Sequence, residues 1–165
     1  MYAHAIFAAV FIWLVVFAII IDTSKLTIPN WISIALVAGF FGFAIVGSKD
    51  ISIWQHLLIG SAVLLGSGVL FHLRWMGGGD VKLLSAVALW AGPSQIIPLL
   101  LVVTLLGAGL ALAMLYTHLW MLGNSGTRQV AVAKRFIPRW VKHGLCPYGI
   151  AIGIGALSII PAIFF

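Results

Sequence analysis

Two aspartates in this chain lie at the edges of long apolar runs. A carboxylate at such a position calls for a structural or functional explanation. The chain has three acidic residues, Asp22, Asp50 and Asp80, and no glutamate. An ionisable group in a membrane segment is by default a candidate functional group. Two carboxylates that lie close together share one proton, which leaves one as a base toward water and the other as an acid toward a carbonyl oxygen. The chemistry open to such a pair is hydrolysis of a peptide bond.

Each aspartate also has a plainer structural interpretation. Asp22 can mark the point where a helix meets water and pair with Lys25 at i+3, and Asp80 can cap a helix N-terminus. Asp50 stands in the polar turn Gly-Ser-Lys-Asp and is expected to cap the next helix rather than to react. Asp22 and Asp80 together favour the catalytic interpretation, because both are expected at the same membrane boundary.

Three glycines directly precede Asp80. Gly77, Gly78 and Gly79 have no Cβ, so another backbone can approach them closely and they can adopt positive φ. A peptidase must hold its substrate extended, and a glycine strip allows an extended peptide to lie beside the aspartate. The alternative is a flexible hinge between two helices.

The composition predicts an integral membrane protein with one domain, residues 1–165. Of the 165 residues, 63% are hydrophobic and 7% are charged, whereas a soluble domain carries about 25% charged residues. The net charge of +6 does not indicate nucleic-acid binding, because the uncharged stretches are long enough to cross a bilayer. The single cysteine, Cys146, excludes an internal disulfide and a multi-cysteine zinc site, and the histidines show no ligand spacing. We expect no metal and no cofactor.

The apolar runs predict an all-α protein of about six transmembrane helices. Residues 83–122 form an uncharged run of 40 residues, and one helix of that length would be about 60 Å long, roughly twice the hydrocarbon core. This run must therefore break, and Ala91-Gly92-Pro93-Ser94 is the expected place. The break leaves the fourth helix short. The expected helices are 1–21, 31–47, 51–73, about 80–91, about 96–122 and about 145–165.

The basic residues predict the orientation in the membrane. The segments after the first, third and fifth helices hold most of them, namely Lys25, Arg74, Lys82, Arg128, Lys134, Arg135, Arg139 and Lys142. By the positive-inside rule these segments are cytoplasmic and both termini face out. Asp22 and Asp80 then lie at the cytoplasmic boundary, and six tryptophans near the expected helix ends fit aromatic belts, namely Trp31, Trp54, Trp75, Trp90, Trp120 and Trp140.

Two motifs resemble those of a known family. Gly-Gly-Gly-Asp80-Val-Lys82-Leu matches the GxGD signature of intramembrane aspartyl proteases and, more narrowly, the Gly-x-Gly-Asp-x-Lys-Leu pattern of the type IV prepilin leader peptidases. The stretch from Asp22 to Asn30, which contains Lys25 and Ile-Pro29-Asn, resembles that family's first aspartate motif. Pro147-Tyr148-Gly149 resembles a third, looser feature.

The resemblance implies that Asp22 and Asp80 are a catalytic pair. The implied substrate is a prepilin or pseudopilin, whose short leader is cut on the cytoplasmic side of the bacterial inner membrane, before the hydrophobic helix of the mature subunit. The implied partners are therefore that substrate, membrane lipid and a pilus or secretion assembly machinery. The motifs leave the oligomeric state open.

One departure from the family pattern is informative. The larger members carry a cysteine-rich cytoplasmic segment and a second activity, N-methylation of the new terminus. This chain has one cysteine and no such insert after the first helix. We therefore expect a compact form that is a peptidase only, similar to those that serve Flp (Tad-type) pili.

The remaining motif residues are expected to shape the site. Lys25 is the better-placed partner for Asp22, whereas Lys82 is expected to point away from Asp80 and to contact lipid phosphate or substrate. Pro29 is expected to start the second helix, and Asn30 to bond nearby backbone or to form a turn. The basic segment Thr127–His143 is interpreted as a topology-fixing loop, with attraction to anionic lipid as the alternative.

Two other functions fit parts of the pattern. A small transporter or channel could use the two aspartates as proton or cation sites, but transporters of that kind often contain internal repeats, and none is evident here. A catalytically inactive assembly factor of a pilus machine is the other alternative, and both aspartates being intact speaks against it.

Overall fold

The computed structural model describes residues 2–46, 51–123 and 148–164, and throughout these ranges its regular structure is helical. This confirms the predicted all-α class. The helices are α1 (Tyr2–Lys25), α2 (Asn30–Val46), α3 (Ile53–His72), α4 (Gly78–Gly123), α7 (Tyr148–Ser158) and α8 (Ile160–Phe164).

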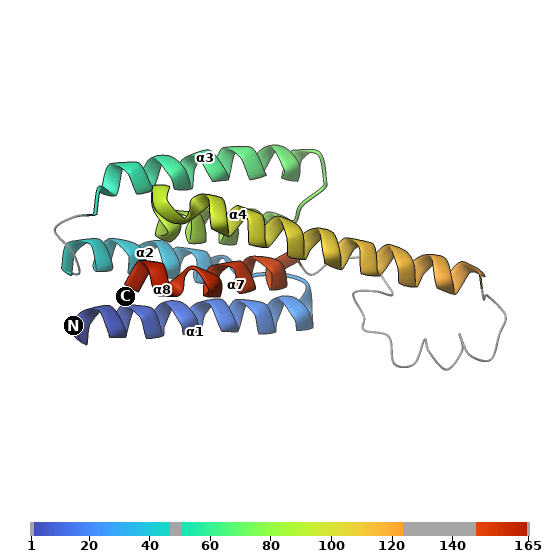
Figure 1. Cartoon of the computed structure of the whole chain (residues 1–165), viewed down its shortest axis with the longest axis horizontal. Helices are drawn as coiled ribbons and strands as arrows, with labels where there is room; N and C mark the ends of the chain where they lie inside the picture. The colour runs from blue at the N-terminus through green and yellow to red at the C-terminus, as the bar shows by residue number, and fades with distance from the viewer. Residues whose placement is uncertain (1, 47–50, 124–147, 165) are drawn as a thin grey trace.

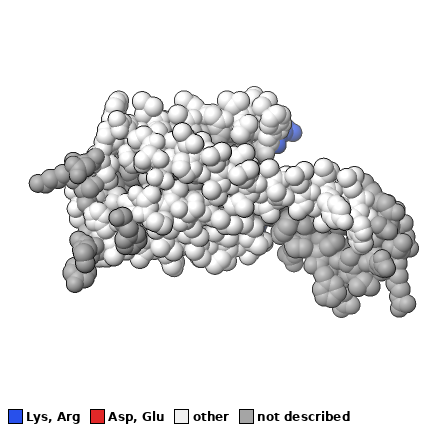
Figure 2. All heavy atoms as spheres, in the orientation of Figure 1, with Lys and Arg blue, Asp and Glu red and all other residues white. Residues whose placement is uncertain are grey.

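The described helices are those of a polytopic membrane protein. Three are long and apolar enough to cross a membrane, over His4–Lys25, Ile53–His72 and Gly78–Trp120, and two shorter ones, Asn30–Val46 and Tyr148–Ser158, are also apolar. On the face shown in Figure 2, the described atoms are almost all uncharged, and basic atoms show at the end of the bundle where α3 finishes. The number of spans and the outward position of both termini remain predictions.

The helices alternate in direction, which gathers the two aspartates at one end (Figure 1). α1, α3 and the second arm of α4 run one way, while α2, the first arm of α4 and α7 run the other. The last turn of α1 and the starts of α2, α4 and α7 therefore lie at one end of the bundle, here called the aspartate end. Both termini of the chain lie at the opposite end.

A tight connection joins α1 to α2 at the aspartate end. α1 ends at Lys25, and the next residue, Leu26, has a φ of 55° and an N–H that donates to the Asp22 carbonyl at 2.8 Å. This is the left-handed arrangement that closes many helices, although glycine is the usual residue in it. Pro29 was expected to start α2 but precedes its first residue, and its carbonyl accepts from the Ile32 N–H at 3.2 Å.

The long uncharged run breaks where it was predicted to. Gly92 has φ 58° and ψ −166° and divides α4 into two arms, with Pro93 directly after it. Proline has no N–H, so the Leu89 carbonyl four residues earlier loses its helical donor. His56 of α3 replaces that donor, with Nδ1 2.7 Å from the Leu89 oxygen. Because a carbonyl oxygen only accepts, Nδ1 carries the proton.

An aromatic cluster fills the interior at the kink. The Trp90 ring lies against the rings of Phe11, Phe40, Phe43 and Phe164, with centroids 5.1–5.8 Å from its own. Trp90 is 3% exposed, and its Nε1–H donates to the Leu36 carbonyl at 2.8 Å.

The prediction that Trp90 belongs to an aromatic belt is therefore wrong. The first arm of α4 is internal to the bundle, so its end does not face lipid. The described belt candidates other than Trp90 are all exposed, namely Trp31, Trp54, Trp75 and Trp120. Trp140 lies outside the described residues.

The start of α3 also differs from the prediction. Ser52 occupies the N-cap position and makes no side-chain capping hydrogen bond. Asp50, the expected cap, lies two residues earlier and outside the described residues.

Candidate active site

A cavity of about 750 Å³ opens at the aspartate end between the last turn of α1, the α3–α4 connection and the start of α7. Both Asp22 and Asp80 line it. Its rim is exposed and its floor is not, since Asp22 is 4% exposed whereas the connecting residues Arg74 and Trp75 lie on the surface. The full lining is Asp22, Leu26, Phe71, His72, Arg74, Trp75, Met76, Gly77, Asp80 and Tyr148.

Asp22 is fixed from the far end of the sequence. Its Oδ2 accepts a hydrogen bond from the Gly149 N–H at 3.0 Å, and Gly149 stands in the first turn of α7. There is no room for a side chain at position 149, because a Cβ there would lie 2.6 Å from Asp22 Oδ2 and 2.8 Å from its Cγ. The glycine therefore lets the start of α7 touch the carboxyl group directly.

Asp80 is fixed by the residue that directly precedes its own helix. It is the third residue of α4, which starts at Gly78, and its carboxyl group accepts from the Gly77 backbone N–H. A Cβ at position 77 would lie 2.9 Å from Asp80 Oδ2. Asp80 is thus not the N-cap that one interpretation suggested. It reaches back from the third helical position, as the acidic member of a capping box does.

The two carboxyl groups form one electrostatic unit. They share the cavity and lie close enough for the charge of Asp22 to act on Asp80. They are the acidic side chains of the described residues, and no group of three histidine, cysteine or acidic side chains in those residues could hold a metal ion. Carboxyl groups that interact in this way favour a state in which only one of them is ionised.

The glycine strip is explained by close packing more than by unusual backbone angles. None of Gly77, Gly78 and Gly79 has positive φ, so that part of the expectation is wrong. A Cβ on Gly79 would lie 3.1 Å from the Ile28 Cβ and 3.2 Å from its backbone nitrogen. A Cβ on Gly78 would lie 3.2 Å from the Phe71 ring. The strip therefore seats the start of α4 against the α1–α2 connection and the end of α3.

Two lysines of the two aspartate motifs lie outside the cavity. Lys25 is exposed in the last turn of α1, and the predicted ion pair between Lys25 and Asp22 is absent from the described structure, where Gly149 takes that place. Lys82 points away from the cavity, as predicted, and its Nζ donates to the Asn30 Oδ1 at 2.9 Å. The contact joins the starts of α2 and α4 beside the site.

The third motif contributes in part. Tyr148 lines the cavity, and its ring and hydroxyl fill the space where a Cβ of Gly107 would stand, so α7 crosses α4 closely there. Gly149 holds Asp22. Pro147 lies outside the described residues, as does the basic segment 127–143.

Several cavity residues were not among the predicted site residues. Leu26 and Arg74 have φ of 55° and 63° and are the described non-glycine residues with positive φ, and both line the cavity. Strained backbone of this kind is concentrated at functional sites. His72 and Arg74 add cationic or titratable groups to the rim. Their position directly before the glycine strip is the one signal that the sequence offered for them.

Comparison with known proteins supports the family resemblance that the motifs indicate. Residues 9–112, which include both aspartates, match the model of the type IV leader peptidase family. Two relatives from Aeromonas salmonicida, one from strain A449, are both described as prepilin leader peptidase/N-methyltransferase and are 31% identical over 121 residues. The alignment covers 64% of this chain and 39% of each relative, so the matched part spans about two-fifths of the length of these curated relatives. No solved structure gives a significant match.

Proposed function

The chain belongs to the type IV leader peptidase family, and we propose that it hydrolyses the leader peptide of a prepilin with Asp22 and Asp80 as the catalytic pair. The observation that carries this proposal is the meeting of the two carboxyl groups in one cavity, although they stand 58 positions apart (80 − 22) in the sequence. Each motif aspartate is also fixed by a glycine N–H.

The proposed mechanism needs one shared proton. The ionised carboxylate takes a proton from a water, whose oxygen attacks the carbonyl carbon of the scissile bond, while the protonated carboxyl donates to the carbonyl oxygen. The tetrahedral intermediate then breaks its C–N bond: the amine leaves with one proton from the pair, and a hydroxyl of the intermediate returns a proton to the pair as the carbonyl re-forms. The two products are the leader, with a new carboxylate, and the mature pilin, with a new amine. The exposed rim of the cavity gives water a route to the buried carboxyl of Asp22.

The position of the site suits a substrate cut beside a hydrophobic helix. The aspartate end holds Lys25, Arg74 and Lys82, and by the positive-inside rule these basic residues support a cytoplasmic position for it. A membrane-anchored prepilin would present the peptide bond before its apolar segment at that level. We propose the bacterial inner membrane as the location and an Flp-like prepilin, or a related pseudopilin, as the substrate.

We further propose that the chain lacks the N-methylation activity that its relatives' description includes. α1 and α2 are joined by residues 26–29 alone, which leaves no insert at that junction, and the chain contains one cysteine. Mass spectrometry of the new pilin N-terminus should therefore find a free amine. A methylated N-terminus, made in a strain without another methyltransferase, would contradict this part.

The test of the main proposal is leader cleavage of a co-expressed prepilin in membranes, read from the size of the pilin and its new N-terminus. Asp22→Asn and Asp80→Asn keep the side-chain size but remove the carboxyl group. We expect each to lower the cleavage rate by at least about 10²–10⁴-fold, the usual contribution of a general acid–base group. Asp50→Asn is the matched control and should cleave at the wild-type rate.

The same experiment separates the alternatives. Cleavage that persists in Asp80→Asn would make that residue a capping residue only and would overturn the two-aspartate mechanism. A chain that never cleaves the prepilin, but whose proton or cation flux in vesicles depends on both aspartates, would be a transporter. Normal pilus assembly by both variants would indicate a scaffold.

A further inference from the structure

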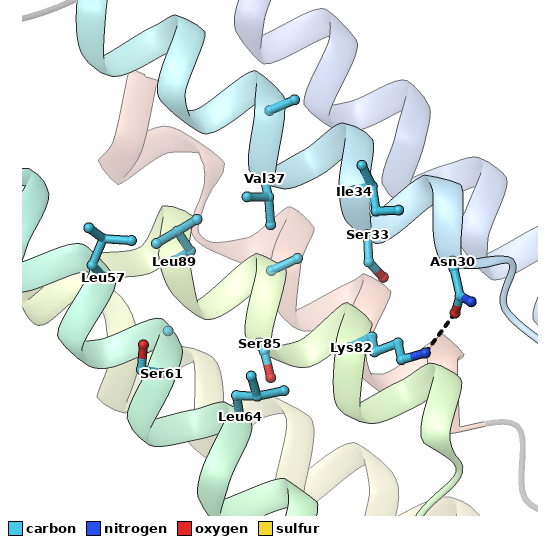
Figure 3. A pocket seen from close by; sticks show the side chains of 13 residues that line it. Asn30, Ser33, Ile34, Val37, Leu57, Ser61, Leu64, Lys82, Ser85 and Leu89 are labelled. Carbon is cyan, nitrogen blue, oxygen red and sulfur yellow. Dashed lines mark hydrogen bonds between the residues drawn. The ribbon is translucent and has the colours of Figure 1, made fainter.

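A second cavity, of about 610 Å³, lies beside the first arm of α4 (Figure 3). It is formed by α2, α3 and that arm. We call it the α2–α3–α4 groove, and its lining is Asn30, Ser33, Ile34, Val37, Ala38, Leu57, Gly60, Ser61, Leu64, Lys82, Ser85, Ala86 and Leu89. No part of it belongs to the aspartate cavity.

The groove changes character along its length. At the aspartate end it begins with Lys82 and Asn30, which are joined by a hydrogen bond of 2.9 Å (Figure 3). One helical turn further on, Ser33 and Ser85 face it. Beyond them the lining is aliphatic apart from Ser61 of α3. The groove thus offers first a cation, then hydroxyl groups and then hydrocarbon. These would contact, in the same order, the phosphate, the glycerol esters and an acyl chain of a phospholipid.

Ser33 has a hydroxyl group that finds no partner among the described residues. It is 7% exposed, and its Oγ is buried without a hydrogen bond to any of them. Other helical serines here donate to a carbonyl of their own helix, such as Ser67 to Val63 at 2.6 Å and Ser85 to Val81 at 2.7 Å. A buried hydroxyl without a partner costs free energy, so the groove offers a hydrogen bond to something that enters it.

The cation at the mouth of the groove also lacks a counter-charge within the described chain. Lys82 forms no ion pair there, and its hydrogen bond to the neutral Asn30 leaves its charge uncompensated. Asp22 and Asp80, the acidic side chains of the described residues, line the other cavity. The start of α2 adds backbone N–H groups beside Lys82, which favour an anion.

The length of the groove suits an acyl chain. Lys82 and Leu89 are seven residues apart on α4, which corresponds to about 10 Å of helix. An extended hydrocarbon chain can follow the groove over that distance within its volume of about 610 Å³.

We propose that the α2–α3–α4 groove binds one anionic phospholipid. Its phosphate lies at Lys82 and the start of α2, a glycerol or ester oxygen accepts from Ser33, and one acyl chain follows the groove toward Leu57 and Leu89. The lipid would fasten α2 and α3 to the first arm of α4, the arm that carries Asp80. The assignment rests on the groove and does not depend on the peptidase activity.

The test is native mass spectrometry of the full chain released from detergent micelles that contain equal amounts of phosphatidylglycerol and phosphatidylcholine. Wild type should retain one phosphatidylglycerol in preference to phosphatidylcholine. Lys82→Gln can still bond Asn30 but has no charge, and it should lower that preference about fivefold, the effect of one basic residue near an anionic surface. Lys82→Arg should keep it, and so should Lys25→Gln, the matched loss of a cation at the same end but outside the groove.

Two more variants test the groove itself. Ser33→Ala should retain less of the bound lipid than wild type at the same collision energy. Ala38→Phe adds a ring at an exposed position of the lining and should abolish retention while melting like wild type. An unchanged phosphatidylglycerol preference in Lys82→Gln, or unchanged retention in Ala38→Phe, would overturn the proposal. Displacement of the lipid by a hydrophobic helical peptide would assign the groove to a peptide instead.

Discussion

The Gly149 N–H donates to Asp22 Oδ2 at 3.0 Å across 127 positions of sequence. The contact ties the first turn of α7 to the last turns of α1, and it is possible only because residue 149 has no side chain. One of the two proposed catalytic carboxyls is thus oriented by a residue near the end of the chain, whereas the other is oriented by Gly77, three positions before it.

We expect Gly149→Ala to impair cleavage without unfolding the protein. The added methyl would lie 2.6 Å from Asp22 Oδ2 and 3.0 Å from its Cβ, so the whole side chain has to move. A displacement of about 1 Å at a catalytic group can lower a rate about 10²-fold. The measurement is the leader-cleavage rate in membranes, with the amount of folded protein read from its elution in detergent.

Gly109→Ala is the matched control for that variant. Gly109 also stands in a helix, but nothing lies within 4 Å of a Cβ built there. Alanine in an exposed helical position is favoured over glycine by about 1 kcal/mol, so this variant should cleave normally and melt no lower than wild type. Equal activity of the two variants would show that the Gly149 contact does not position Asp22.

Gly77→Ala should reduce cleavage less than Gly149→Ala does. The added Cβ would meet only the carboxyl end of Asp80, at 2.9 Å from Oδ2 and 3.7 Å from Cγ, and a carboxyl group can rotate away about its last bond. We expect a loss of about tenfold, because the catalytic group is misplaced but keeps its range of rotamers. The reverse order of the two effects, measured in the same cleavage assay, would contradict this account.

A shared proton predicts a cleavage rate with an optimum in pH. The pair is inactive when it gains a second proton at low pH, because no base remains, and inactive when it loses its one proton at high pH, because no acid remains. The rate should therefore fall on both sides, with the prepilin held in the same detergent throughout. A profile with a single limb would mean that one of the carboxyls titrates outside the catalytic cycle.

The residue types near each helix end predicted most of the helix boundaries. The segments expected over 31–47 and 51–73 are found as Asn30–Val46 and Ile53–His72, and the break falls on Gly92, where glycine and proline adjoin. These features depend on neighbours in sequence. The expected final helix over 145–165 is instead found as α7 and α8, and the interruption at Ile159 lies where Pro161 has no N–H to donate to the Leu157 carbonyl.

Contacts between distant segments were harder to predict. The i+3 spacing predicts that Lys25 pairs with Asp22, but the Asp22 carboxyl group instead accepts from a backbone N–H of α7. Trp90 has the type of a belt residue but lies inside, because the first arm of α4 is central to the bundle. Such outcomes follow from which helices pack together, and hydropathy alone carries little information on that.

The bond between His56 and Leu89 should contribute measurably to stability. His56 supplies the donor that Pro93 cannot, and its ring also stacks on Phe40 with centroids 5.2 Å apart. His56→Phe keeps a ring but leaves the Leu89 carbonyl without a donor, which costs about 1–3 kcal/mol in a buried site. We expect a lower melting temperature in detergent.

His56→Asn, which retains a donor near the position of Nδ1, should recover part of the loss, and His118→Phe, at an exposed position of α4, should change nothing. If His56→Phe melts like wild type, the Leu89 carbonyl is satisfied in another way and the kink does not depend on α3.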